Sequence, residues 1–210
     1  GNANMMNRGG NRLSCFFICR GIPGFFCIGG DLMTIRKAAA ADLPGAQAVY
    51  ERVHDAEEAG KTATGWVRGV YPTRRTAEEA LAADELYVME EDGRILAVMR
   101  VNGEQGEVYA RCPWQFSARG DAVLVLHTLA VDPTCGGRGC GTAMVEFYED
   151  LARARGCAAL RIDTNVTNAR ARAFYAKLGF REAGVFPCVF NGIEGVRLVC
   201  LEKRVEGAAR

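Results

Sequence analysis

Residues 122–141, AVLVLHTLAVDPTCGGRGCG, contain the pattern that decides the fold. An apolar, β-branched run ends at Val131, and Asp132-Pro133 leads into four glycines within six positions. Apolar residues then recur at helical spacing, at Met144, Phe147, Tyr148, Leu151 and Ala152. A strand, a glycine loop and a helix are therefore expected in succession. Because the N–H groups at a helix N-terminus lack partners and glycine admits close approach, this arrangement predicts a phosphorylated ligand.

Two familiar phosphate-binding loops do not match this stretch, and a tight surface turn is the structural alternative. Gly136 to Gly141 satisfies G-x-x-x-x-G, but Thr142 and Ala143 stand where a P-loop needs Lys and then Ser or Thr. The glycine spacing also differs from the dinucleotide fingerprint G-x-G-x-x-G. The loop instead resembles the pyrophosphate loop Q/R-x-x-G-x-G/A of the GCN5-related N-acetyltransferases. Gly136 departs from that pattern, because the family usually has Gln or Arg there, but the backbone cradle does not depend on that side chain.

A second motif follows at the expected distance. Residues 159–164 read as a short strand, and residues 169–178 as a helix ended by a glycine. From Asn168 to Phe180 the chain reads N-x-x-A-x-x-F-Y-x-K-x-G-F, which is similar to the second half of the same family's cofactor site. The resemblance covers about residues 33–204. It implies acetyl-CoA (coenzyme A) as the cofactor, held by Leu129, Ala130, Val131, Gly136, Gly137, Arg138, Gly139, Cys140, Gly141, Thr142, Asn168, Ala171 and Tyr175.

The remaining patterns predict an α/β (α+β) fold. A helix capped by Asp42 and a second one over residues 76–83 are expected, and Asp92-Gly93 indicates a hairpin. The predicted strands are residues 33–38, 86–90, 95–101, 107–111, 123–131, 159–164, 185–190 and 196–203. This order favours a mixed, mostly antiparallel central sheet of about seven strands with helices on both faces, which is also the fold of the GCN5-related family.

Composition narrows the class of protein. The chain has 210 residues, 49% of them hydrophobic, and a formal net charge of +1, so neither a nucleic acid nor a membrane is an expected partner. The nine cysteines form no C-x-x-C pair, which favours reduced thiols in a cytoplasmic protein and no metal site. Residues 33–206 are expected to form the domain, with Met33 as its natural start. Residues 1–32 are an unassigned N-terminal appendage that only loosely resembles a signal peptide.

Direct attack of a neutral amine on a thioester needs two proton transfers and no enzyme nucleophile. The resemblance implies that Tyr175 protonates the leaving thiolate and that a histidine such as His127 acts as the base, as in some arylalkylamine acetyltransferases. Asn165 is expected to orient the substrate or a water. N–H groups near residues 129–131 are expected to bind the thioester carbonyl. The structural alternatives are a core tyrosine and a core histidine, and Asp163 is expected to point away as a cap.

The acceptor site is expected to include Trp66, Arg68 and Tyr71, which lie in the loop after the first helix, and Cys188 near the last strand. The predicted function is acetyl-CoA-dependent transfer of an acetyl group directly to a small primary amine, namely an amino acid, a polyamine-like compound or a peptide N-terminus. The alternative is a non-catalytic acyl-CoA-binding sensor or assembly module. A homodimer that pairs through the final strands is also plausible for such a sheet.

Overall fold

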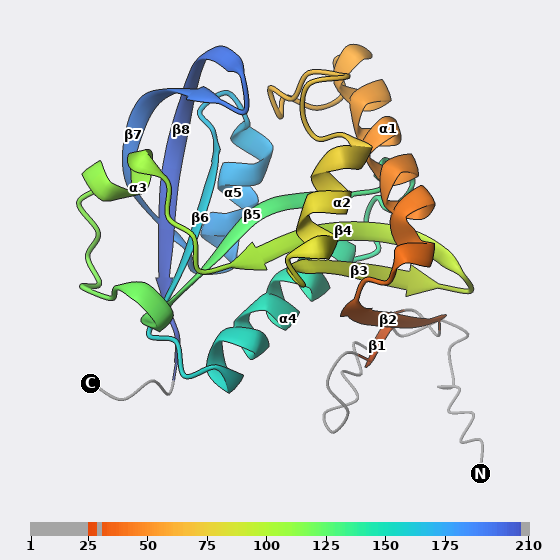
Figure 1. The fold of residues 1–210 in the computed structure, drawn as a ribbon, viewed down its shortest axis with the longest axis horizontal. Helices are drawn as coiled ribbons and strands as arrows, with labels where there is room; N and C mark the ends of the chain where they lie inside the picture. The colour runs from red at the N-terminus through yellow and green to blue at the C-terminus, as the bar shows by residue number, and fades with distance from the viewer. Residues whose placement is uncertain (1–24, 29–30, 207–210) are drawn as a thin grey trace, which may run out of the picture.

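The computed structural model describes residues 25–28 and 31–206, so most of the expected appendage lies outside the described residues (Figure 1). Its strands form one sheet in the order β1-β2-β3-β4-β5-β6-β8-β7, in which β5 and β6 are parallel and the other neighbours antiparallel. The mixed, mostly antiparallel sheet is thereby confirmed. The strands are β1 (Phe25–Ile28), β2 (Asp31–Lys37), β3 (Leu86–Glu91), β4 (Arg94–Asn102), β5 (Val123–Val131), β6 (Ala159–Asn165), β7 (Arg181–Phe190) and β8 (Ile193–Arg204).

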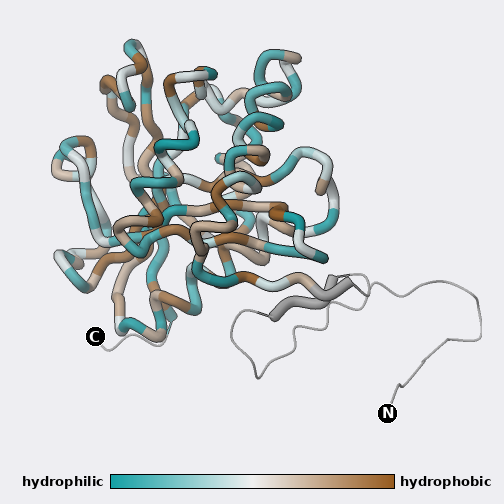
Figure 2. Tube along the Cα trace, turned by 45° about the vertical axis from the view of Figure 1, so that its right-hand side comes forward, coloured by the Kyte–Doolittle hydropathy of each residue, from teal (hydrophilic) through white to brown (hydrophobic). Residues whose placement is uncertain are grey.

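Helices cover both faces of this sheet, as predicted (Figure 1). One face packs against α1 (Leu43–Glu58) and α2 (Arg74–Ala82) through a cluster that includes Tyr50 and Ala80. The other face packs against α4 (Cys140–Ala154) and α5 (Ala169–Lys177) through a larger cluster. Apolar residues follow the strands through the centre, whereas the loops and outer helix faces are polar (Figure 2). The two cores therefore come from the alternation of strand side chains between faces.

Tyr148 ties α4 to the two parallel strands. Its buried hydroxyl lies 2.6 Å from the carbonyl oxygen of Leu124 in β5 and 3.1 Å from that of Arg161 in β6. A buried hydroxyl needs such partners, because burying it unpaired would cost free energy. Both contacts fall on the halves of β5 and β6 that pair with each other, so Tyr148 stabilises the closed end of this strand pair.

Three elements differ from the sequence expectation. Residues 107–111 form the short helix α3 (Glu107–Arg111) instead of a strand, because so short an apolar run carries no decisive period. Helix α2 begins at Arg74 with Thr73 as its N-cap, so Thr76 is the inner partner of the capping box and not its start. Strand β1 lies within the segment assigned to the appendage and pairs with β2, so the sheet extends upstream of Met33.

No helix in the described part of the chain is both long enough and apolar enough to cross a membrane.

Candidate active site

Strands β5 and β6 pair at one end and separate at the other. Their parallel register ends at Leu126 opposite Ile162, and beyond that point they diverge (Figure 1). A β-bulge in β5 leaves His127 without a partner in β4. The amide of Asp132 donates to Leu96 in β4 at 2.8 Å. Because donor direction alternates along a strand, the N–H groups of residues 129 and 131 face the gap beside β6.

The glycine loop begins where this gap opens. Asp132 caps the short turn Pro133–Cys135 by accepting a hydrogen bond from the amide of Thr134 at 2.9 Å. Gly137 and Gly139 then adopt φ values of 78° and 76°, a conformation that favours glycine. Among the described residues, no backbone acceptor binds the amides of the remaining loop and first helical positions, namely Gly136, Gly137, Gly139, Cys140, Gly141 and Thr142. These donors suit a pyrophosphate, so the loop fits the expected cofactor.

Charged side chains brace the loop. The buried carboxylate of Asp132 pairs with Arg94 at 2.6 Å and with Arg52 at 2.8 Å. Arg138 pairs with Glu91 at the end of β3, and this contact holds the pKa of Glu91 below its ordinary value. The guanidinium of Arg138 is thus held at the loop by a carboxylate. Its expected role in cofactor binding remains a prediction.

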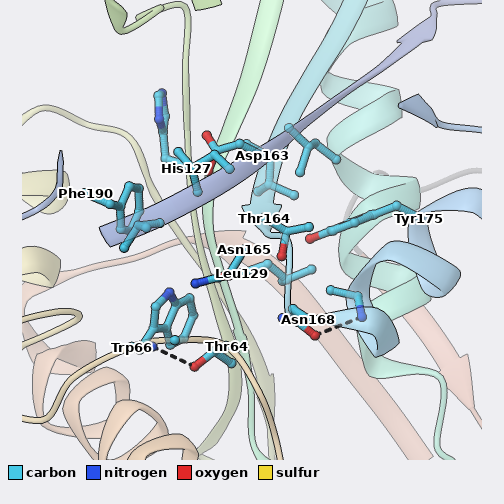
Figure 3. Close-up of a pocket in the computed structure, with 16 residues that line it drawn as sticks. Thr64, Trp66, His127, Leu129, Asp163, Thr164, Asn165, Asn168, Tyr175 and Phe190 are labelled. Atoms are coloured by element: carbon cyan, nitrogen blue, oxygen red, sulfur yellow. Dashed lines mark hydrogen bonds between the residues drawn. The ribbon is translucent and has the colours of Figure 1, made fainter. Parts of the chain in front are cut away.

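A first cavity lies in the gap between β5 and β6 (Figure 3). It brings together Leu129, Asn165, Asn168, Ala171 and Tyr175, which the sequence assigned to the cofactor or to catalysis. Ala130 instead points to the opposite face and packs in the α1–α2 core, so only its backbone could serve the site. The first cavity lies beside β5, and the glycine loop follows the end of the same strand.

Tyr175 is buried on α5 and directs its hydroxyl into the cavity, toward the end of β6 (Figure 3). Phe174 and Phe180 pack against its ring at centroid distances of 5.2 and 5.8 Å. The hydroxyl makes no hydrogen bond to another described residue. Burial raises the pKa of Tyr175 above its ordinary value of 10, so the phenol keeps its proton at neutral pH.

The two asparagines have local structural partners. Asn168 is the N-cap of α5 and accepts a hydrogen bond from the amide of Ala171 at 3.0 Å. Asn165 accepts from the amide of Thr167 at 3.1 Å, which shapes the turn between β6 and α5. The side-chain nitrogen of Asn165 reaches across to Gly65, where an added Cβ would lie 2.3 Å from it. Asn165 therefore joins the two sides of the first cavity.

A second, larger cavity of about 1030 Å³ meets the first. Its walls are the segment 104–111 and the end of β7, and it shares four residues with the first cavity, namely His127, Asp163, Phe190 and Leu198. Cys188, assigned to the acceptor site, lines this second cavity, and burial raises the pKa of its thiol. The junction thus carries two titratable groups, His127 and Asp163, between the gap of β5 and β6 and the second cavity.

His127 and Asp163 differ in how they hold a proton. The Nε2–H of His127 donates to Oδ1 of Asn102 at 2.5 Å, because the amide nitrogen of Asn102 is already used by Glu85. Burial and the nearby charge of Arg100 lower the pKa of His127 to about 4. Burial raises the pKa of Asp163 to about 6, although the Tyr109 hydroxyl donates to its Oδ2 at 2.8 Å. Asp163 therefore faces the site, contrary to the expectation that it points away as a cap.

The loop after α1 forms the remaining wall. Trp66 lines the first cavity, and Tyr71 packs against Trp66 and Phe190 at ring distances of 5.9 and 5.2 Å. The Tyr71 hydroxyl forms a hydrogen bond with the hydroxyl of Thr128, so Tyr71 supports this wall from the side away from the first cavity. Glu57 holds the loop from below by accepting hydrogen bonds from its hydroxyl and amide groups, among them the amide of Gly65 at 2.9 Å.

Arg68 lies away from both cavities. It pairs with three carboxylates on the outer side of α1, namely Glu51, Asp55 and Glu58. The structure therefore contradicts its assignment to the acceptor site. A sequence cannot show this pairing, because the acids lie on a helix ten or more positions earlier in the chain and meet Arg68 only when the loop folds back.

Sequence reasoning missed Tyr109 and underestimated Asp163. Tyr109 lies on the segment that was expected to be a strand, and its partner lies 54 positions away. The one available signal was the polar end of strand β6, since carboxylates and amides at a strand end can point into a site. Asn102 and Glu85, which orient His127, gave no signal of their own.

Several known proteins similar to this chain are described as acetyltransferases. The sequence profile of the Acetyltransferase (GNAT) family matches residues 46–180. An uncharacterized N-acetyltransferase of Methanocaldococcus jannaschii is 34% identical over 100 residues, which are 47% of this chain and 44% of that protein. The ribosomal protein bS18 alanine N-acetyltransferase of Escherichia coli K12 is 40% identical over 60 residues, which are 29% of this chain and 40% of that protein.

The matched parts span less than half the length of these two relatives. A solved structure from Streptococcus agalactiae 2603, described as an acetyltransferase of the GNAT family, superposes with a TM-score of 0.69 at 24% identity. That superposition covers 83% of this chain and 96% of the other, and it shows a shared fold.

Proposed function

Since the chain belongs to the acetyltransferase (GNAT) family, we propose that it is an N-acetyltransferase that moves the acetyl group of acetyl-CoA directly to a primary amine. The observation that carries this proposal is the junction of the two cavities. Asp163 lies at this junction, and Leu129 of the diverging strand and Tyr175 line the first cavity with it, while the second cavity is open on the acceptor side. A protein that only bound acyl-CoA would need the glycine loop but not these proton-transferring groups.

The chain's own residues supply binding and orientation. The amides of residues 136, 137 and 139–142 would hold the pyrophosphate, and the N–H groups of Leu129 and Val131 would donate to the thioester carbonyl. Acetyl-CoA supplies the acetyl group as an activated thioester. Donors that are already fixed in a strand stabilise the negative charge that develops on this oxygen without having to reorganise.

Two side chains that line the first cavity can move the protons. Tyr175 would donate its hydroxyl proton to the leaving sulfur, for which a phenol that stays protonated at pH 7 is suited. Asp163 would accept the proton of the attacking amine, because its pKa of about 6 makes it the more basic of the two groups at the junction. His127, expected from the sequence to be the base, would instead stay neutral and orient the acceptor.

We propose a narrower class of acceptor than primary amines in general. The E. coli relative acts on the alanine N-terminus of a ribosomal protein, and the second cavity is large enough for a peptide end. Glu104 and Glu107 line this cavity with Asp163, whereas Arg111 is its basic residue. This charge balance suits a cationic acceptor such as an amino acid amide, a polyamine or a peptide N-terminus.

The test combines binding with turnover. Calorimetry would measure acetyl-CoA binding, and thiol release would be followed against amino acids, polyamines, arylalkylamines and peptides with an N-terminal alanine. Binding together with turnover on one class is the expected result, and it would identify the acceptor. Binding without any turnover would support the acyl-CoA-binding module instead. Failure to bind acetyl-CoA would overturn the proposal.

The loop itself can be tested with a matched pair of glycines. Gly139→Ala should weaken acetyl-CoA binding about tenfold, because a side chain at φ 76° costs about 1–2 kcal/mol and displaces the amides of the loop. Gly156→Ala is the control: its φ is 70° at the other end of α4, remote from the site. Both variants should lose similar thermal stability. Equal acetyl-CoA affinities in the two variants would argue against the loop as the binding site.

A further inference from the structure

Residues 103–122 connect two antiparallel neighbours, β4 and β5, which a short hairpin turn could have joined. The chain instead makes a long excursion that includes α3 and crosses the same face of the sheet as α1 and α2 (Figure 1). Val108, Tyr109 and Cys112 pack from this excursion onto β5, β6 and β8, and its first half forms a wall of the second cavity. Its position is therefore relevant to the site.

A buried arginine holds the middle of the excursion. Arg161 on β6 is 4% exposed, and its guanidinium donates to the carbonyl oxygens of Phe116 at 3.1 Å and Ala118 at 3.3 Å. It also donates to the side chain of Gln105 and lies 4.2 Å from the centroid of the Trp114 ring. A buried cation is costly, so contacts of this number indicate a specific structural role.

Glu202 supplies the compensating charge. It lies opposite Arg161 in the register of β6 with β8 and is 2% exposed. Its two oxygens accept hydrogen bonds from the amides of Gln115 at 2.5 Å and Phe116 at 3.3 Å. The pair therefore binds the backbone of residues 115–118 from both sides, through donors on Arg161 and acceptors on Glu202.

From this anchor the contacts lead to the junction of the cavities. The indole nitrogen of Trp114 donates to the carbonyl oxygen of Tyr109 at 2.8 Å, and the two rings pack at 5.3 Å. Tyr109 is 5% exposed, and its hydroxyl donates to Oδ2 of Asp163 at 2.8 Å. Among the described residues, the Tyr109 hydroxyl is the donor to the carboxylate of Asp163, and it binds Oδ2. Oδ1 therefore remains available to a substrate.

We propose that Tyr109 is a positioning residue that fixes Oδ2 of Asp163 and presents Oδ1 to the acceptor amine, with Arg161 and Glu202 holding Tyr109 in place. The inference rests on the proposed role of Asp163 as the base. As the new C–N bond forms, the amine proton moves to Oδ1, and the electron pair of the N–H bond stays on nitrogen. The C–S bond of the thioester breaks, its electron pair leaves with the sulfur, and Tyr175 would supply the proton that this sulfur takes up. The Tyr109 proton is not transferred, and Asp163 later releases its proton to solvent.

Six titratable side chains surround Asp163, and their own pKa values do not obscure its titration in a pH profile of activity. They are Tyr109 from α3, Cys188 from β7, Cys200 from β8, Tyr175 from α5, Tyr71 from the loop after α1 and His127 from β5. Burial raises the pKa of each of these tyrosines and cysteines, and it lowers that of His127. These six groups stay neutral between pH 5 and pH 8, while the charged residues on the cavity rim are Glu104, Glu107 and Arg111.

The test is the pH profile of kcat/KM for the acceptor in Tyr109→Phe. Removing a donor that stabilises the carboxylate should move the acidic limb upward by about one pH unit, because a hydrogen bond to a charged group is worth about that much. The KM for acetyl-CoA should not change. Tyr87→Phe is the matched control: it deletes another buried tyrosine hydroxyl, bound to Arg155 on the other face of the sheet, and should leave the limb in place.

Arg161→Met tests the anchor, since it removes the guanidinium and keeps an apolar chain. We expect a raised acceptor KM and an acidic limb displaced in the same direction as in Tyr109→Phe, with Arg161→Lys giving partial rescue. Asp163→Asn separates the two proposals. If it abolishes the limb while Tyr109→Phe leaves it unmoved, the positioning role is wrong and the base assignment stands. If the limb persists in Asp163→Asn, the base assignment itself is wrong.

Discussion

Replacing Asp163 by asparagine is expected to lower kcat/KM for the acceptor about 100- to 10,000-fold, the usual contribution of a general base. Asparagine keeps the shape and can still accept the hydrogen bond from Tyr109, so the cavities should be preserved. The KM for acetyl-CoA should stay within about twofold, because no residue of the glycine loop lines either of the cavities that Asp163 lines. Steady-state kinetics with each substrate varied in turn would measure both effects.

The pH profile adds a second readout for this variant. In the wild-type protein, activity should fall as the pH drops through about 6, where Asp163 takes up a proton. Asp163→Asn should lack this limb. His127→Ala should keep it, because the pKa of His127 is already lowered to about 4. Loss of the limb in His127→Ala alone would return the role of base to the histidine.

The same substitution should stabilise the protein at high pH. The pKa of Asp163 in the folded state, about 6, exceeds the ordinary value of 3.8, so its carboxyl favours folding at low pH and loses this contribution as the pH rises through 6. At pH 8 the ionised group costs at most about 3 kcal/mol. We therefore expect Asp163→Asn to melt at a higher temperature than wild type at pH 8, and not at pH 4. Equal melting temperatures at pH 8 would show that the ionised carboxylate of Asp163 does not destabilise the folded protein.

Replacing Tyr175 by phenylalanine is expected to lower kcat about 100-fold with little change in acetyl-CoA affinity. The ring packing against Phe174 and Phe180 is kept, and only the hydroxyl that faces the cavity is lost. Without this donor the sulfur must leave as a thiolate or find a proton from water. Single-turnover kinetics with calorimetry would separate the chemical step from binding.

The pH profile gives a second test of the assignment of Tyr175. Because burial raises the pKa of Tyr175, wild-type activity should not fall until well above pH 10 on account of this group. Tyr87→Phe again serves as the control for removal of a buried hydroxyl. Unchanged turnover in Tyr175→Phe would show that Tyr175 is not the acid. A loss of acetyl-CoA binding as large as the loss of turnover would show that Tyr175 only lines the cavity.

The sequence by itself predicted the residues of the proposed cofactor half of the site. The glycines before α4 and the motif from Asn168 to Phe180 are local patterns, and local hydrogen bonding is enough to form a positive-φ loop, a helix N-terminus and an N-cap. The mixed sheet could be predicted for the same reason, because the alternation along each strand reports which side is buried.

Only the tertiary structure decided the acceptor half. Asp163 lies where two cavities meet, and it accepts a hydrogen bond from Tyr109, which the folded excursion brings from 54 positions away. The sequence suggested that Arg68 binds the substrate, but in the folded protein its loop places Arg68 against the acidic residues of α1. Burial and charge pairing set the proton affinity and availability of such groups, and both are sums over neighbours that are distant in the chain.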